Sequence, residues 1–318
     1  MTSHNIAPSV LLHPLPQPPW LARTAWPFHT FGIESDGARL AVTEAGNGPT
    51  LLFVHVGTWS FIWRDLVLRL ASDFHCVFFD APGNGQTQDD PASAVTLVGA
   101  GRAVEAVIAA RNLQDFTLVA HDLGGPASVA AVAATPHRVR AIVAMNAFAW
   151  RPSGAAFRGM LALMGSRFMR EFDAATGLIP RITATSFGVG RHMDESSRAA
   201  FRAGMGSRGI RAFHDYLRDA RHCDDLYRTT DRALTGSLAH VPLLTIFGER
   251  NDPLGFQKRW KELFQQARQV VVSGGNHFPM CDAPDFVAQT IRAWHRECVT
   301  QGSKESFSEK QEKSKHEA

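Results

Sequence analysis

A single aspartate stands between an apolar run and a stretch of small residues. Phe116–Ala120 has the character of a buried strand, and Asp122 follows it directly before Leu-Gly-Gly-Pro-Ala. A tight strand-to-helix turn needs small residues such as Gly124 and Gly125, because bulky side chains would clash as the helix packs back on the sheet. The pattern predicts a nucleophile elbow with Asp122 at its tip. A plain helix cap would also place an aspartate here, but it would not require the small neighbours.

An aspartate at such a tip favours a different reaction from that of a serine. A carboxylate is already ionised at pH 7 and can displace a leaving group from a saturated carbon. Its attack on an acyl carbon would give an unstable anhydride, so the product expected from Asp122 is an alkyl ester. Water must then hydrolyse that ester, and the attacking water needs a general base.

The elements around this residue alternate between strands and helices. Eight short β-branched or aromatic runs are bounded by turn residues: Phe28–Glu34, Arg39–Glu44, Leu51–His55, Cys76–Asp80, Phe116–Ala120, Arg140–Met145, Leu243–Phe247 and Gln269–Val272. Helical spacing follows several of them, at Trp63–Ala71, Leu97–Ala110, Ala127–Ala134, Gln257–Phe264 and Asp285–Cys298. This alternation predicts an α/β fold with a mostly parallel eight-stranded sheet covered on both faces.

The domain boundaries follow from composition. A Pro-rich arm is expected at 1–24, an α/β core at 25–149 and 241–299, and a charged, disordered tail at 300–318. Residues 150–240 contain amphipathic pieces without a convincing strand, which predicts a helical lid. Such an insertion would cover the carboxyl ends of the strands, where ligands bind in parallel sheets.

Charge and composition exclude several classes of protein. The 318 residues carry 33 Lys+Arg against 30 Asp+Glu, too balanced for a protein that binds duplex nucleic acid. The four cysteines form no C-x-x-C pair, and no apolar run is long enough for a membrane helix. We therefore expect a cytoplasmic protein that needs neither metal nor cofactor and binds neither nucleic acid nor membrane. Its oligomeric state is left open.

Six fragments together resemble the α/β-hydrolase family, in its aspartate-nucleophile branch of haloalkane dehalogenases and epoxide hydrolases. The resemblance covers about Trp26 to Val299 and keeps the family's order along the chain. The fragments are Leu51-Leu-Phe-Val-His55 with Thr58–Arg64, Phe79–Gly85, the elbow at Asp122, Met145-Asn-Ala-Phe, Phe247–Pro253 and Gly274-Gly-Asn-His277-Phe-Pro. The resemblance implies an α/β-hydrolase fold with an inserted helical lid.

It also implies a catalytic triad. Asp122 would be the nucleophile, His277 the base that activates water, and an acid would orient the histidine. One part of the family places this acid after the strand that leads into the lid, where this chain has the uncharged Asn146. The other part places it after the next core strand, which favours Asp252 over its rival Glu249.

The residues that assist the reaction are predicted less completely. By resemblance the backbone N–H of Leu123 is one oxyanion donor, and Val56 or Gly57 supplies the other from a turn that lacks the family's proline. The family's tryptophan after the nucleophile is also replaced by Leu123. Candidate halide donors are then Trp59, Trp63 and Trp150, of which the first two are better explained by core packing. In the epoxide hydrolase alternative, Tyr216 would protonate the opening ring.

The predicted function is therefore a haloalkane dehalogenase-like hydrolase acting on a small or medium apolar substrate and water. Two alternatives are an epoxide hydrolase and a member of the fold that binds a ligand without turnover. Two other sequence patterns do not indicate a functional site. A G-x-G-x-x-G at Gly204–Gly209 lacks the preceding strand that a dinucleotide site needs, and the group around His214 and His222 is interpreted as a solvated polar face.

Overall fold

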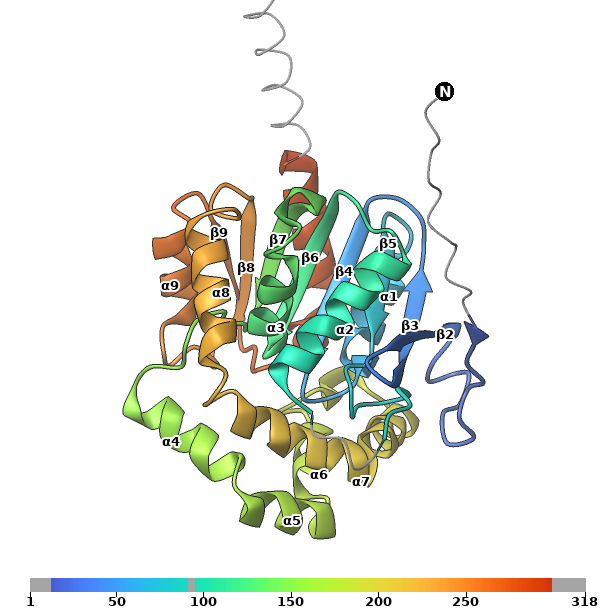
Figure 1. The fold of residues 1–318 in the computed structure, drawn as a ribbon. Helices are drawn as coiled ribbons and strands as arrows, with labels where there is room; N and C mark the ends of the chain where they lie inside the picture. The colour runs from blue at the N-terminus through green and yellow to red at the C-terminus, as the bar shows by residue number, and fades with distance from the viewer. Residues whose placement is uncertain (1–12, 91–94, 299–318) are drawn as a thin grey trace, which may run out of the picture.

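A nine-stranded sheet forms the centre of the protein (Figure 1). The structure is a computed structural model and describes residues 13–90 and 95–298. The strands are β1 (His13–Pro14), β2 (Thr30–Ser35), β3 (Ala38–Ala45), β4 (Thr50–Val56), β5 (His75–Phe79), β6 (Phe116–Asp122), β7 (Val139–Met145), β8 (Leu243–Gly248) and β9 (Arg268–Val272). Their order is β1-β2-β3-β5-β4-β6-β7-β8-β9, parallel from β5 to β9 and antiparallel from β1 to β5. The mostly parallel sheet predicted from the sequence is confirmed.

The predicted count of eight strands is wrong by one. The ninth is β1, which lies inside the Pro-rich segment expected at 1–24 and pairs with β2, His13 opposite Gly32. A strand of two residues has no alternation to detect, so only its partner could reveal it. The first 12 residues of that arm lie outside the described part of the chain, as does the tail expected at 300–318.

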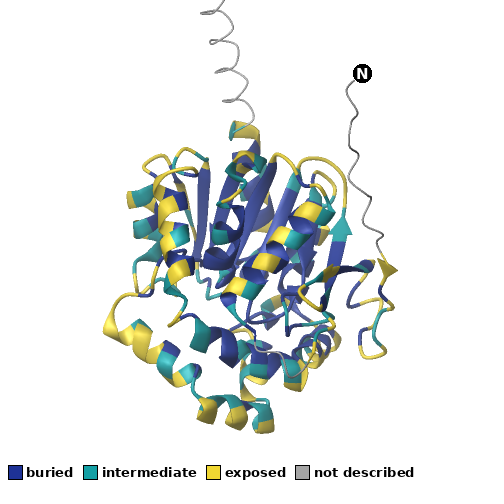
Figure 2. Ribbon diagram, in the orientation of Figure 1, coloured by how far each residue is buried: buried dark blue, intermediate teal, exposed yellow. Residues whose placement is uncertain are grey.

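Helices cover both faces of the sheet. On one face lie α2 (Leu97–Ala110), α3 (Gly124–Val132), α8 (Asp224–Thr235) and α9 (Phe256–Leu263). On the other lie α1 (Arg64–Leu70) and a helix that includes residues 284–298. Two apolar clusters fill the space between these helices and the sheet, so the central strands are buried along their length (Figure 2). Among the described residues, no helix could cross a membrane.

The chain between β7 and β8 is helical throughout its regular elements. It forms α4 (Ala155–Met164), α5 (Arg167–Thr176), α6 (Leu178–Thr183), the 3₁₀ turn η3 (Gly190–His192), α7 (Glu195–Asp219) and α8. Helices α4 to α7 lie across the carboxyl ends of the strands (Figure 1), whereas α8 packs against α3 beside the sheet. The cover over the site is therefore built by α4 to α7.

The glycines of the G-x-G-x-x-G pattern shape α7. The helix is kinked at Gly206, whose φ is 46°. A Cβ on Gly204 would come 2.2 Å from the ring of Trp59, so only glycine lets α7 approach that indole. The Trp59 Nε1–H donates to the carbonyl of Phe201 at 3.0 Å. The pattern thus serves packing between lid and core.

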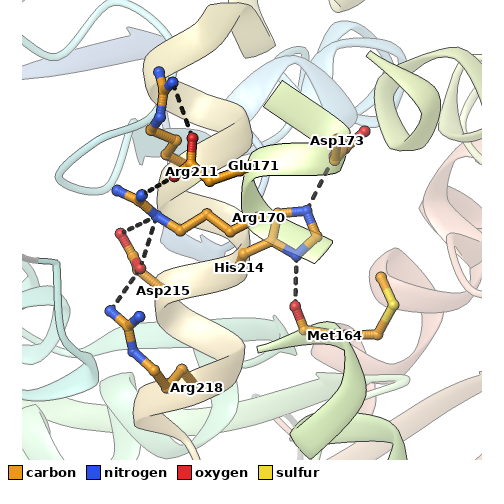
Figure 3. A network of polar contacts seen from close by, with 8 residues as sticks. All are labelled: Met164, Arg170, Glu171, Asp173, Arg211, His214, Asp215 and Arg218. Atoms are coloured by element: carbon orange, nitrogen blue, oxygen red, sulfur yellow. Dashed lines mark hydrogen bonds and ion pairs between the residues drawn. The ribbon is translucent and has the colours of Figure 1, made fainter. Parts of the chain in front are cut away.

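A buried polar network joins the lid helices to one another (Figure 3). His214 of α7 is completely buried, with Nε2 3.1 Å from Oδ2 of Asp173 in α5 and Nδ1 2.5 Å from the carbonyl of Met164 at the end of α4. Beside it, Asp215 pairs with Arg170 of α5 at 3.1 Å. The interpretation of His214 as part of a solvated face is wrong, because it is a buried tie between three helices. No described cluster of His, Cys, Asp or Glu has the geometry of a metal site.

Candidate active site

Asp122 ends β6 in a backbone conformation that few side chains adopt. Its φ is 49°, in the left-handed region. The two glycines after it allow this turn, because α3 returns against the sheet immediately. A Cβ on Gly124 would lie 2.4 Å from the carbonyl oxygen of Val54, and one on Gly125 would lie 2.0 Å from that of Phe148. The small residues noted in the sequence are therefore required by close backbone contacts.

His277 faces the Asp122 carboxylate from the loop between β9 and α10 (Pro279–Asp282). Its Nε2 lies 3.4 Å from Oδ2 of Asp122. Residues of two neighbouring strands hold the main chain of this loop. The carbonyl oxygen of His277 accepts hydrogen bonds from Nδ2 of Asn146, which follows β7, and from Nε2 of His121 in β6, both at 2.8 Å. The side chains of His277 and Asp122 remain 33% and 27% exposed, so a ligand can reach both.

The surroundings of Asp122 favour its ionised form. Burial raises the pKa of the carboxyl, but the hydrogen bond with His277, the charge that His277 carries when protonated, and the Leu123 N–H together lower it by more. The net pKa lies below the usual value of 3.8. At neutral pH the group is a carboxylate, which is the form that attacks an electrophilic carbon.

The prediction that Asp252 is the acid beside His277 is wrong, because its carboxylate binds the start of α9. Its two oxygens accept the N–H groups of Phe256 and Gln257 at the start of α9, at 2.6 and 2.9 Å. These N–H groups have no partner within the helix, so an adjacent carboxylate binds them readily. The residue beside His277 is the preceding one: Nδ2 of Asn251 lies 3.1 Å from Nδ1 of the imidazole.

The rival acid is also absent from this position. Oε2 of Glu249 accepts the Gly274 N–H at 2.5 Å and the Ser273 hydroxyl at 3.3 Å, outside the cavity. Asn146, at the alternative place for the acid, uses its amide to donate to the carbonyls of Asn276 and His277. At both positions where an acid could partner His277, the chain has an amide, Asn146 after β7 and Asn251 after β8.

Two buried histidines that the sequence reasoning missed lie beneath the pair. The Thr58 backbone N–H donates to Nε2 of His55 at 3.2 Å, so a neutral His55 carries its proton on Nδ1. That Nδ1 lies 2.9 Å from Nδ1 of His121, which then carries its own proton on Nε2 and donates to the His277 carbonyl. The chain of hydrogen bonds is complete with both rings neutral.

Burial keeps these rings uncharged. It lowers the pKa of His55 to about 3 and that of His121 well below 6.5, and a charge on His277 would lower both further. A signal was present in the sequence: each histidine follows an apolar run within its strand, where a buried polar side chain must have partners. The histidines join the turn after β4 to the loop that carries His277.

The predicted oxyanion donors Leu123, Val56 and Gly57 all line the cavity that contains Asp122. The Leu123 N–H already contacts the Asp122 carboxylate, and Val56 and Gly57 line the same cavity. Gly57 has φ of 111°, which only glycine adopts without strain. Thr58 is excluded as the second donor, because its N–H is bound to His55.

The cavity above Asp122 has a volume of about 490 Å³ and is mainly apolar. Its walls include Phe148, Phe157, Met160, Met164, Phe213 and Phe256. Both leaving-group residues predicted from the sequence lie outside it, and no described tryptophan or tyrosine lines it.

The two displaced residues have other partners. Trp150 is 2% exposed, packs edge-on against Trp260 and has the Arg259 guanidinium over its ring. Tyr216 is completely buried and donates its hydroxyl proton to the Pro82 carbonyl at 2.7 Å. Burial raises the pKa of Tyr216 far above 10, and neither residue can act on a leaving group.

Comparisons with known proteins show the family of this chain. A sequence model described as "Alpha/beta hydrolase family" matches residues 51–290. "Haloalkane dehalogenase 2" of Mycobacterium tuberculosis is 25% identical over 279 residues, which are 84% of this chain and 94% of the relative. The "Cis-3-alkyl-4-alkyloxetan-2-one decarboxylase" of Shewanella oneidensis is 26% identical over 291 residues, covering 87% and 91%.

The fold comparison points the same way. The crystal structure of haloalkane dehalogenase DbeA from Bradyrhizobium elkani superposes with a TM-score of 0.72 at 21% identity, covering 86% of this chain and 99% of that one. The chain belongs to the alpha/beta hydrolase family and is a hydrolase-class enzyme. The resemblance to the haloalkane dehalogenase-like branch noted in the sequence is confirmed.

Proposed function

We propose that this protein hydrolyses a carbon–halogen bond of a small or medium apolar substrate through an alkyl ester on Asp122. The observation that carries the proposal is the ionised Asp122 on its strained turn, 3.4 Å from His277, at the base of an apolar cavity. Relatives named as haloalkane dehalogenases add support.

The reaction has two steps. Oδ2 of Asp122 attacks the carbon that bears the halogen, the carbon–halogen bond breaks, and the halide leaves with the bonding electrons. His277 then takes a proton from water, whose oxygen adds to the ester carbonyl carbon. The oxyanion is stabilised by N–H groups of the Leu123 turn and the Val56–Gly57 turn. Its collapse returns the carboxylate and releases the alcohol, which receives the proton from His277.

The epoxide hydrolase alternative is not proposed. It depended on Tyr216 as the acid that protonates the opening ring, and that hydroxyl is bound to the Pro82 carbonyl outside the cavity. Ligand binding without turnover is also set aside, because the chain is an enzyme of the hydrolase class.

One observation favours a second candidate, a β-lactone substrate such as the oxetan-2-one named for the Shewanella relative. No indole N–H among the described residues lines the cavity to receive a halide. In a β-lactone, ring strain assists cleavage and the leaving carboxylate stays attached to the substrate. Attack by Asp122 would open the ring, and loss of CO₂ would form a C=C bond while the ester C–O bond breaks, which consumes no water.

The two candidates are separated by their products. Purified protein is incubated with 1-bromohexane and, separately, with a cis-3,4-dialkyl-oxetan-2-one, and bromide, CO₂ and alkene are measured. Bromide and hexanol released together support the dehalogenase. Alkene and CO₂ without bromide release support the β-lactone reaction. If well-folded protein forms neither set of products, both candidate functions are contradicted.

The small-molecule substrate and water remain the only partners we propose. A cytoplasmic location stays a prediction.

A further inference from the structure

Asn251 is the residue whose side chain contacts Nδ1 of His277. The inference from this contact rests on the proposed dehalogenase function and concerns the hydrolysis of its ester. We propose that Asn251 is a positioning residue that orients His277 without charge, so that breakdown of the Asp122 ester is the slow step. The enzyme then accumulates in its alkylated form during turnover.

The partner of His277 at Nδ1 is an uncharged amide. An amide can either donate from Nδ2 or accept at Oδ1, so Asn251 holds the imidazole in place in either tautomer. It brings no negative charge, whereas an aspartate would both fix the tautomer and stabilise the imidazolium. Asn251 therefore supplies orientation but little stabilisation of a protonated His277.

The two carboxylates near this loop form hydrogen bonds with groups other than His277. Both oxygens of Asp252 bind the start of α9. Asp282, which is buried close to this loop, accepts the Asn276 N–H at 2.5 Å and pairs with Nε of Arg191 at 3.2 Å. Asp252 is thus engaged by helix N–H groups, and Asp282 acts on His277 only through its charge, without a hydrogen bond to the imidazole.

The negative charge of Asp122 is present only before the ester forms. Before the reaction its carboxylate lies 3.4 Å from Nε2 of His277 and would stabilise an imidazolium. Once Asp122 is esterified, that charge is lost at the moment when His277 must accept a proton from water. The first step requires no proton transfer to His277, so alkylation is unaffected while hydrolysis is slowed.

Triads in other enzymes set the scale. Exchange of the aspartate for asparagine in a Ser-His-Asp triad lowers kcat by about 10⁴-fold. Asn251 can still present its oxygen to Nδ1–H, so we expect restoration of the charge to increase ester hydrolysis by a smaller factor, about 10- to 100-fold.

The experiment compares wild type, Asn251→Asp and a matched control, Asn112→Asp. Asn112 is exposed and precedes the start of β6, at the end of the sheet opposite the site, so its substitution makes the same chemical change remotely. Each protein is mixed with saturating 1-bromohexane, bromide release is followed by stopped flow, and the alkylated fraction is measured by intact-protein mass spectrometry. His277→Gln is included as the variant that cannot hydrolyse the ester.

We expect wild type to release a burst of about one bromide per protein and then turn over slowly, with most molecules carrying a hexyl group. Asn251→Asp should show the same burst rate, a faster steady state and a small alkylated fraction, whereas Asn112→Asp should match wild type. The wild-type burst tests the proposal even if Asn251→Asp fails to fold.

Two results would overturn the proposal. One is a wild type that turns over without a burst and stays unmodified, although His277→Gln becomes alkylated; the dehalogenase function would then stand and the slow hydrolysis would not. The other is a folded Asn251→Asp that hydrolyses the ester no faster than wild type. If His277→Gln also gains no hexyl group, the proposed function itself fails.

Discussion

At the end of β6 the chain places a carboxylate on a strained turn, whereas at the ends of β7 and β8 it places the amides of Asn146 and Asn251. The first region presents charge to the cavity. The second fixes positions, because Asn146 holds the loop of His277 and Asn251 lies against its ring. Equivalent strand ends of one sheet can therefore carry different kinds of polar side chain. In the proposed mechanism the nucleophile that forms the ester is charged, whereas Asn251, beside the histidine that hydrolyses it, is uncharged.

The largest effect is expected from removal of the charge at β6. Asp122→Asn should lower product formation by at least ~10³-fold, because an amide is a far weaker nucleophile than a carboxylate. Bromide release and circular dichroism check activity and fold together. The matched control is Asp252→Asn, which alters a carboxylate outside the cavity and should leave bromide release close to wild type. Equal losses in both variants would contradict the division between the two regions.

A second prediction concerns the buried histidines under the site. The pKa of His121 is lowered in the folded protein. As the pH falls below about 6.5, the imidazole is therefore protonated in the unfolded state but stays neutral in the folded state. Its contribution to stability is complete above that pH and is lost on acidification. This one group changes the unfolding free energy by about 1.4 kcal/mol per pH unit.

Comparison with His121→Asn isolates this contribution from those of other groups. Chemical denaturation between about pH 4 and 6 should give a shallower pH dependence in the variant than in wild type, by about that slope. The groups facing His121 are His55, His277 and Asp122, and all three are retained. Parallel slopes would show that His121 is protonated in the folded protein.

The elbow provides a third test, of stability. Gly125→Ala would place a Cβ 2.0 Å from the Phe148 carbonyl oxygen, and relief requires movement of α3 from the sheet. We expect a loss of about 2–3 kcal/mol in unfolding free energy. Gly159→Ala in α4 is the control, since no atom lies within 4 Å of the added Cβ and alanine favours helix. A Gly125→Ala protein as stable as wild type would contradict the close packing.

The smallest effect is expected at the start of α9. Asp252→Ala removes the acceptor for two helix N–H groups and should lower the unfolding free energy by about 1 kcal/mol. Thermal or chemical denaturation measures this change. The rate of bromide release per molecule of protein should stay near that of wild type. A selective loss of activity with unchanged stability would restore Asp252 as the partner of His277.

The sheet could be predicted from the sequence because its strands carry repeated local signals. All eight predicted strands are present, since each is an apolar or β-branched run bounded by turn residues. β1 escaped because two residues carry no period. The lid was predicted as helical, but which helices cover the site depends on packing. α8, for example, belongs beside α3 although it lies within the same insertion.

The site shows the same limit at the level of side chains. Asp122 and His277 could be found because their neighbours are constrained by the turn and the loop. Asn251 and Asp252 are adjacent, and which of them faces His277 depends on the path of the backbone, which no residue type reveals. Trp150 and Tyr216 lie in segments near the cavity but do not line it, because Trp150 packs against Trp260 and the Tyr216 hydroxyl is bound to the Pro82 carbonyl.

The most direct test of the central claim is a covalent one. His277→Gln is incubated with 1-bromohexane, and the intact mass and the peptide map are measured. We expect a mass gain of one hexyl group located on Asp122, with one bromide released per protein. A folded protein that gains no hexyl group, or one alkylated at a residue other than Asp122, would contradict it.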